Sequence, residues 1–350
     1  MLGASNLSLL DAKDFIEYCY PESNLSCVKI SHNVAARAVI YSLLVFATIV
    51  TILGNSVVII SIAHFKQLHT PTNILVMSLA LVDLLLGLTV MPFSMVRTVD
   101  GCWYFGEEFC YWHSTFDFLF TGASIFHLIS IAADRHQAVC YPLHYPSRIT
   151  LPVAGLMAAL SWILATVYAF SSIGLNAKMN IGEYIVSVNC FGNCLVLISE
   201  ACASICTCLF FIVPVCVMIG LYTQIFLVSD RHARTIEVTK KGRSDITSST
   251  KISQKVKHEK KAAKTLGIVV GAFNACWMPY YITSLIDTFS HNTTTGILPE
   301  LFNWLTYINS TLNPIIYGLF YPWFRKTLYL IVTLKIFAPN SSDIKVCNLK

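Results

Sequence analysis

Two acidic positions lie inside one long apolar stretch, Cys110 to Arg135, with the sequence CYWHSTFDFLFTGASIFHLISIAADR. Asp117 follows Cys110 by about two helical turns, and Asp134 precedes Arg135 at the far end. In a helix, Asp117 and Arg135 would be about 27 Å apart on the same face, which is close to the hydrocarbon thickness of a bilayer. A charge inside a membrane helix is costly and indicates a functional site. We therefore expect Asp117 to hold a cationic ligand near the outer surface and Asp134-Arg135 to hold a switch at the inner surface.

The composition indicates an integral membrane protein. Of 350 residues, 55% are hydrophobic and only 12% are charged, whereas a soluble domain carries about 25% charged residues. The mean hydropathy is +0.63. The apolar composition makes membrane lipids an expected partner. The net charge of +5 is modest, and no nucleic-acid partner is expected.

Seven apolar runs are each long enough for the roughly 20 residues of a membrane helix. We place them at 39–63, 73–97, 108–136, 152–173, 203–228, 263–287 and 299–320. The expected fold is an all-α, seven-helix membrane bundle over residues 39–320, preceded by an extracellular tail, 1–38. Residues 321–350 are expected to form a short amphipathic helix 8, at 321–333 on the inner surface, and a cytoplasmic tail.

Lys and Arg gather in residues 229–262, the intracellular loop between the fifth and sixth runs. This bias predicts an extracellular N-terminus. The basic loop is either a solvated, lipid-facing charge cluster or a contact site for a partner. Asn6 and Asn24 begin glycosylation sequons in the outer tail, where no signal peptide is expected.

Motifs in these runs resemble, in order and spacing, those of the rhodopsin-like G-protein-coupled receptors. They are Gly54-Asn55, Leu79-Ala80 with Asp83, Asp134-Arg135-His136, Trp162, Pro214 with Tyr222, Cys276-Trp277-Met278-Pro279 and Asn313-Pro314-Ile315-Ile316-Tyr317. The resemblance covers nearly the whole chain. The segment from Asn309-Ser310 through Tyr321 to Trp323-Phe324 is similar to the fingerprint of the trace amine-associated receptors. FKQLHTPTN at 65–73 and KAAKTLG at 261–267 are similar to that group as well.

The resemblance implies that Asp117 binds the ammonium group of an amine, because the acid at this position does so in aminergic receptors. The alternative is a structural partner for a buried Lys or Arg. Aromatic faces attract ammonium groups, and the remaining expected ligand-binding residues are Trp277, Tyr307, Tyr280, Tyr281, Phe118, Thr207 and His113. Catecholamine sites of related receptors usually have serines in the fifth run, where this sequence offers Ala203, Cys206, Thr207 and Phe210. We also find no second acid that would suit a diamine, so the sequence favours a primary or methylated monoamine with a weakly polar tail.

A second polar set is expected deeper in the bundle: Asp83, Asn55, Ser124, Asn309, Ser310 and Asn313. The resemblance implies an allosteric sodium ion here, the only cofactor expected. Hydrogen bonds that join the helices are the alternative, and both can hold together.

The resemblance also implies a switch for a heterotrimeric G protein. Asp134 and Glu259 would hold Arg135 in the resting state, and Tyr222 and Tyr317 would close inward on activation. His136 stands where the family usually has Tyr.

Cysteines of the outer segments are expected to form disulfides. The resemblance implies Cys110–Cys194, and extra tail-to-loop bridges that we pair as Cys19–Cys190 and Cys27–Cys102. The sequence alone allows other pairings.

The protein is expected to be a plasma-membrane receptor for trace or volatile amines that activates a heterotrimeric G protein. More specifically, we expect coupling to Gs, which raises cAMP, and an olfactory role. A receptor for another biogenic monoamine is the alternative of the same class. A transporter would be expected to show matching halves, and we find none. An enzyme is not expected, since His113 and His127 lack the spacing of HxxxH or HExxH metal motifs.

Overall fold

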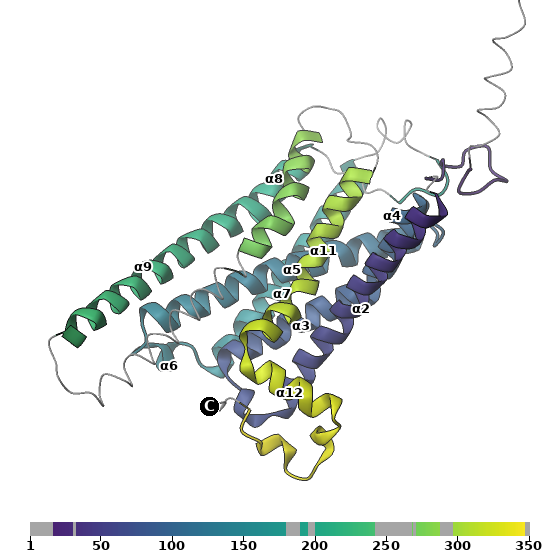
Figure 1. Cartoon of the computed structure of the whole chain (residues 1–350). Helices are drawn as coiled ribbons and strands as arrows, with labels where there is room; N and C mark the ends of the chain where they lie inside the picture. Colours follow the sequence, from purple (N-terminus) through teal and green to yellow (C-terminus); the bar gives the residue numbers. More distant parts are fainter. Residues whose placement is uncertain are drawn as a thin grey trace, which may run out of the picture.

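The structure is a computed structural model that describes residues 17–30, 33–179, 190–194, 200–241, 268, 271–287 and 297–346. Long helices run side by side in an elongated bundle (Figure 1). The described part of the N-terminal tail lies at one end of the bundle, and the short helix α12 lies across the other end. This arrangement confirms the helical membrane bundle expected from the sequence.

The helices follow the apolar runs closely. They are α2 (Val34–His64), α3 (Pro71–Thr89), α4 (Met91–Asp100), α5 (Glu107–Cys140), α6 (Tyr145–Arg148), α7 (Leu151–Met179), α8 (Glu200–Thr207), α9 (Val213–Lys241), α11 (Ile297–Phe320) and α12 (Pro322–Val332), with a further helical stretch at 271–287. Within the described ranges, five stretches are long and apolar enough to cross a membrane: Val34–His64, Pro71–Thr89, Glu107–Cys140, Leu151–Ile173 and Ser204–Arg231. Only part of the sixth expected run, 263–287, is described.

Two proline positions interrupt the regular helix. The expected run 73–97 is divided at Val90 into α3 and α4, because Pro92 has no backbone N–H with which to continue the hydrogen-bond ladder. In the fifth run, the π-helical turn η3 (Cys208–Ile212) separates α8 from α9 and directly precedes Pro214. The helix of α9 then continues to Lys241, beyond the expected end of the run at residue 228.

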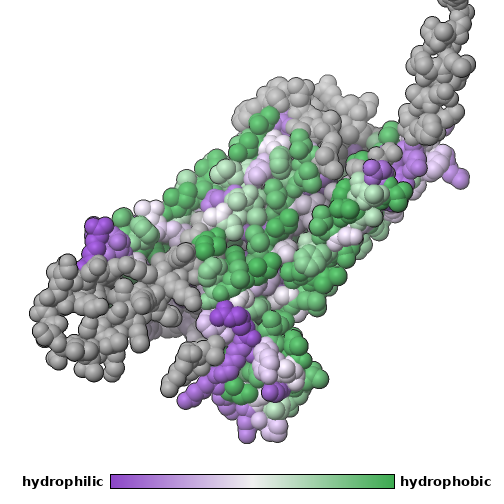
Figure 2. Space-filling view, viewed as in Figure 1, coloured by the Kyte–Doolittle hydropathy of each residue, from purple (hydrophilic) through white to green (hydrophobic). Residues whose placement is uncertain are grey.

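Apolar side chains cover the middle of the bundle, and hydrophilic ones gather near its ends (Figure 2). Leu43, Phe46 and Leu53 of α2 are exposed, as expected of side chains that face lipid. Polar groups such as Asn55 and Asp83 are instead fully buried inside. The bundle is thus apolar on the outside with a polar interior, which suits a hydrocarbon solvent.

The expected amphipathic helix 8 is α12, whose Trp323 and Phe324 are buried. The chain after it folds back onto the short turn η1 (Lys66–Leu68). Lys66 forms an ion pair with Asp343 at 2.9 Å, and the Val346 amide donates to Gln67 Oε1 at 2.7 Å. The segment after α12 is therefore attached next to the C-terminal end of α2.

The contact between α2 and α11 depends on Gly54. A Cβ atom added at Gly54 would lie 2.6 Å from Cγ of Pro314. We expect Gly54→Ala to lower the melting temperature of the detergent-solubilised protein, because such overpacking typically costs about 1–3 kcal/mol.

Gly155→Ala on α7 is the matched control, because no atom lies within 4 Å of the added Cβ there. This control should leave stability unchanged or raise it slightly. Equal melting temperatures for the two variants would contradict the close helix contact.

Candidate functional site

A cavity of about 60 Å³ opens among α5, α7, α8, the 271–287 helix and α11. Its walls carry one carboxylate, several aromatic rings and small hydroxyl and thiol groups. The lining residues are Asp117, Phe118, Thr121, Tyr168, Cys206, Thr207, Trp277, Tyr280, Tyr281, Ser284, Asn303 and Thr306. Six of the eight expected ligand-binding residues are in this list.

Asp117 is half-buried on α5 and faces the cavity. Its Oδ2 accepts a hydrogen bond of 2.7 Å from the Tyr307 hydroxyl of α11. Asn303, one turn earlier on α11, donates from Nδ2 to the same hydroxyl at 2.9 Å. Across the described ranges, no Lys or Arg forms an ion pair with Asp117. The carboxylate is therefore oriented by one neutral donor, and the described residues give it no cationic partner.

Aromatic rings form the wall next to Asp117. Trp277 and Tyr281 stack with ring centroids 5.8 Å apart, and Tyr281 stacks on Phe211 of η3 at 4.4 Å. From the opposite side, Tyr168 of α7 packs against Phe118 at 5.7 Å. These faces surround the carboxylate with the quadrupoles that attract an ammonium group.

Two expected ligand-binding residues lie outside the cavity wall. Tyr307 is fully buried and reaches the site only through its bond to Asp117. His113, also expected to bind the ligand, is not among the residues that line this cavity. Its ring is fully buried next to Ser94 and packs 5.0 Å from Trp103.

Several lining residues were not anticipated from the sequence. Asn303 and Thr306 lie one turn and one residue before Tyr307 on α11, so helical periodicity around Tyr307 could have identified Asn303. Thr121 likewise lies one turn after Asp117. Tyr168 and Ser284 carry no comparable signal, since their place in the wall depends on how α7 and the 271–287 helix pack.

Hydrogen bonds join part of the deeper polar set. Asp83 is fully buried and accepts hydrogen bonds of 2.7 Å from the Ser310 hydroxyl and from Nδ2 of Asn313. These bonds join α3 to α11, as the helix-joining interpretation requires. Ser124 Oγ and Asn309 Nδ2 are buried without a hydrogen-bond partner in the described structure. Buried polar atoms normally have partners, and a carboxylate with a free hydroxyl oxygen is a donor set that fits a hard cation such as sodium.

Near the C-terminal end of α5, Asp134 holds Arg135. Arg135 donates from Nε and Nη2 to Asp134 Oδ2 at 2.9 and 2.6 Å. Asp134 also accepts from the hydroxyls of Thr72, at 2.7 Å, and Tyr145, at 2.8 Å. Burial, together with the nearby Asp134, raises the pKa of the Tyr145 hydroxyl above its ordinary value, so this hydroxyl stays protonated and donates. Arg135 is thus tied to a fully buried, four-fold bonded carboxylate.

The other expected switch residues are placed less completely. Glu259 lies outside the described residues, so its pairing with Arg135 stays a prediction. Tyr317 is buried in the cluster that contains Trp323, and Tyr222 packs against the cluster that contains Phe273. His136 bonds through Nε2 to Gln224 Oε1 at 2.6 Å and so links α5 to α9.

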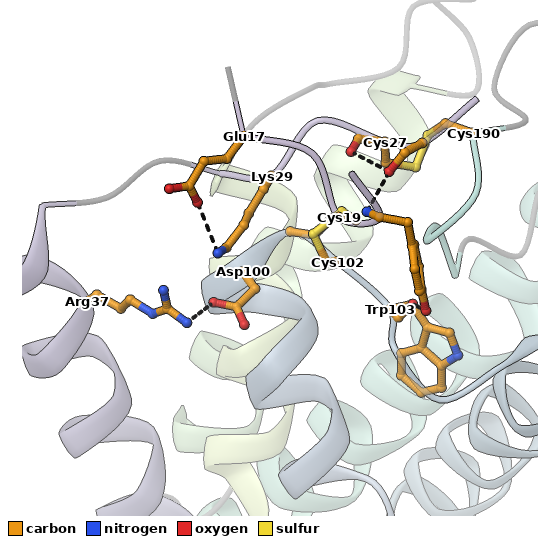
Figure 3. Close-up of a disulfide and its surroundings, with 12 residues drawn as sticks. Glu17, Cys19, Cys27, Lys29, Arg37, Asp100, Cys102, Trp103 and Cys190 are labelled. Carbon is orange, nitrogen blue, oxygen red and sulfur yellow. Dashed lines mark hydrogen bonds and ion pairs between the residues drawn. A yellow bond between two sulfur atoms is a disulfide. The ribbon is translucent and has the colours of Figure 1, made fainter. Parts of the chain in front are cut away.

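Three disulfides join the N-terminal tail, the start of α5 and the segments at 102 and 190–194. Cys110–Cys194 is present as expected. The other expected pairing is wrong, because the structure contains Cys19–Cys102 and Cys27–Cys190 (Figure 3).

The pairing follows from how the tail lies on the two outer loops. The Cys27 amide donates to the Phe191 carbonyl at 3.0 Å, which brings Cys27 next to Cys190. The Tyr20 hydroxyl donates to the Trp103 carbonyl at 3.1 Å, which holds the Cys19 end of the tail over the first loop. Ion pairs of Lys29 with Glu17 and of Arg37 with Asp100 flank the same segment (Figure 3). Of the two sequons, Asn24 is exposed and Asn6 lies outside the described residues.

The sequence matches the family described as 7 transmembrane receptor (rhodopsin family) over residues 54–317. Trace amine-associated receptor 13c of Danio rerio is 55% identical over 332 residues, which cover 94% of this chain and 96% of that protein. Trace amine-associated receptor 9 of Mus musculus is 45% identical over 328 residues, covering 93% and 94%. Trace amine-associated receptor 7c of Rattus norvegicus is 43% identical over 347 residues, covering 99% and 94%.

Proposed function

Because the chain belongs to the trace amine-associated receptors, within the rhodopsin family of G-protein-coupled receptors, we propose that it detects a small monoamine whose ammonium group binds to Asp117. Membership in this family makes the chain a multi-pass membrane receptor for amines. The proposal adds the residues of the site, the class of amine and the route to the G protein. It also places the N-terminus outside the plasma membrane.

The observation that carries the proposal is the state of the Asp117 carboxylate. It is held by the Tyr307 hydroxyl at 2.7 Å and lines an aromatic cavity. A buried anion without a cationic partner is unfavourable, and an ammonium ion supplies the missing charge. The attraction between the two ions is strong here because the site holds little water.

The cavity supports a small monoamine as the ligand. Asp117 is the only acidic residue among the described residues that line it, so a second ammonium group would find no partner. At about 60 Å³ the cavity is far smaller than the 300–1,000 Å³ typical of drug-binding pockets. Thr207 is the hydrogen-bonding partner that the fifth run offers to a weakly polar tail.

We further propose that Asp83, Ser124, Asn309 and Asn313 hold a sodium ion in the resting state. The ion would supply a positive charge that these buried groups lack. At the inner end, Asp134 holds Arg135 until span six moves outward and admits a G protein, with Tyr222 and Tyr317 closing inward. This is a two-state element whose equilibrium the amine shifts.

A screen of volatile and biogenic monoamines against a cAMP reporter tests the proposed function. We expect at least one primary or methylated monoamine to raise cAMP through Gs. A response limited to catecholamines would favour the alternative of a biogenic monoamine receptor. An olfactory role would require in addition that the active amines are volatile.

Asp134→Ala is expected to raise basal signalling several-fold, because it removes both hydrogen bonds that hold Arg135 to α5. It also removes the acceptor for Thr72 and Tyr145, so surface expression must be measured beside ligand-independent cAMP.

Asp230→Ala is the matched control. This substitution breaks the exposed Asp230–Arg234 ion pair on α9. Its distance of 2.8 Å between Arg234 Nε and Asp230 Oδ2 is similar to the 2.6 Å between Arg135 Nη2 and Asp134 Oδ2. Basal cAMP should stay at the wild-type level in this variant. Equal basal activity in both variants would argue against Asp134 as a restraint on Arg135.

A further inference from the structure

His113 is a buried imidazole one helical turn before Asp117, outside the cavity wall. Its Nε2 lies 3.1 Å from Ser94 Oγ and 3.3 Å from the Val90 carbonyl oxygen. Its Nδ1 is buried without a hydrogen-bond partner in the described structure. A polar ring in this setting requires an explanation beyond filling space, since an apolar side chain would avoid the unpaired nitrogen.

Hydrogen bonds connect His113 to Asp117 through two hydroxyl groups. Ser94 Oγ lies 3.4 Å from the Tyr307 hydroxyl oxygen, and that hydroxyl lies 2.7 Å from Asp117 Oδ2. The chain of contacts therefore runs from α5 to α4, on to α11, and back to α5 one turn further along.

The chemistry of the two ends fixes the direction of every bond. An ionised carboxylate can only accept, so the Tyr307 hydroxyl donates its one hydrogen to Asp117. The Tyr307 oxygen can then only accept, from Asn303 Nδ2 at 2.9 Å and from Ser94 Oγ at 3.4 Å. Ser94 therefore donates to Tyr307, and His113 donates to Ser94. The Val90 carbonyl supports the same tautomer of His113 independently. It can only accept, so the ring hydrogen must be on Nε2, which shares it between Ser94 and Val90. All donors point toward the carboxylate, which is the arrangement in which hydrogen bonds strengthen one another.

We propose that His113 is a positioning residue that acts through Ser94 to hold the Tyr307 hydroxyl as a donor to Asp117. The inference rests on the proposed function of Asp117 as the ammonium site. With the phenol held from behind, one carboxylate oxygen is occupied and the carboxylate keeps a fixed orientation toward the cavity. The ligand therefore meets a site that is ordered before it binds, which reduces the entropy lost on binding.

The test is a double-mutant cycle between His113 and Tyr307, read as EC50 in cells expressing equal amounts of surface receptor. The probes are 2-phenylethylamine, N-methyl-2-phenylethylamine, 3-methylbutylamine and trimethylamine, and the most potent of them is used throughout. His113→Phe should raise the EC50 roughly 3- to 10-fold, the equivalent of one lost hydrogen bond. His113→Gln, which keeps a donor on a side chain of similar reach, should recover most of the loss.

The decisive comparison is made in the Tyr307→Phe background. There, His113→Phe should cause no further loss, because the hydroxyl through which it acts is absent. Ser94→Ala should behave as His113→Phe does, and it provides a second variant should His113→Phe fail to reach the surface. Thr115→Ala is the matched control, because its buried hydroxyl bonds only the Tyr111 carbonyl of its own helix, and its EC50 should not change.

The outcomes separate this inference from the function beneath it. A wild-type receptor silent to all four amines, or one unaffected by Asp117→Ala, overturns the proposed function and this inference with it. A responding receptor that depends on Asp117, but in which the His113→Phe and Ser94→Ala losses persist in full in the Tyr307→Phe background, overturns only the positioning role.

Discussion

Asp117→Ala is expected to abolish the amine response while the receptor still reaches the cell surface. Removal of one member of a desolvated charge pair typically costs about 2–5 kcal/mol, which is roughly a 30-fold to several-thousand-fold rise in EC50. The side chain is half-buried against the cavity, and its only described side-chain partner is the Tyr307 hydroxyl. Its loss should therefore remove ligand affinity with little effect on helix packing. Dose-response curves normalised to surface receptor measure the effect.

Two further variants separate charge from other effects of the substitution. Asp117→Asn keeps an acceptor for Tyr307 but removes the negative charge, and it should lose nearly as much potency as the alanine variant. Glu108→Ala removes an exposed acid from the first turn of the same helix and should leave the EC50 unchanged. An unaltered dose-response in Asp117→Ala would refute the ammonium site.

Cys110→Ser is expected to keep most of the protein inside the cell. The Cys110–Cys194 bond spans a sequence separation of 84 residues, and closing a loop of that size stabilises the folded state by about 4–5 kcal/mol in the chain-entropy model. The bond ties the second outer loop to the start of α5, one turn from the level of His113. The measurement is the ratio of surface to total receptor, detected through an N-terminal tag.

Cys216→Ser is the matched control, because Cys216 is a free and exposed cysteine on α9. Its surface fraction should equal that of the wild type. The Cys27–Cys190 bond would still attach the second loop to the tail in Cys110→Ser, so the variant tests attachment of this loop to α5 specifically. Normal surface delivery and amine binding in Cys110→Ser would show that this attachment is dispensable.

The two buried or half-buried acids of α5, Asp117 and Asp134, differ in the hydrogen bonds and charges that surround them. Towards the N-terminal end, Asp117 receives one hydroxyl donor and no cation from the described residues, which leaves its charge available to a ligand. Towards the C-terminal end, Asp134 receives four hydrogen bonds, two of them from Arg135. The first acid is free to bind a mobile cation, whereas the second is saturated by the protein. That difference suits one site to detection and the other to restraint.

Much of the fold and part of the site could be predicted from the sequence. The long apolar runs determine membrane helices because hydrocarbon excludes unpaired backbone groups, and this requirement acts on each run separately. Helical periodicity places Asp117 and Arg135 on one face, since it depends only on the spacing of residues within one helix. The position of Asp117 in a mostly apolar helix is therefore a local property, and so is its candidate role.

Only the tertiary structure decided the features that join separate helices or loops. Four cysteines permit three pairings, and the choice of Cys19–Cys102 with Cys27–Cys190 depends on how the tail crosses both loops. His113 lies on the same helix as Asp117, yet its contacts with Ser94 and Val90 arise from the packing of α4 against α5. Periodicity gives the face of a residue but not the group opposite it. For that reason the sequence identified the candidate carboxylate for an amine, and the packing of three helices determined what holds that carboxylate in place.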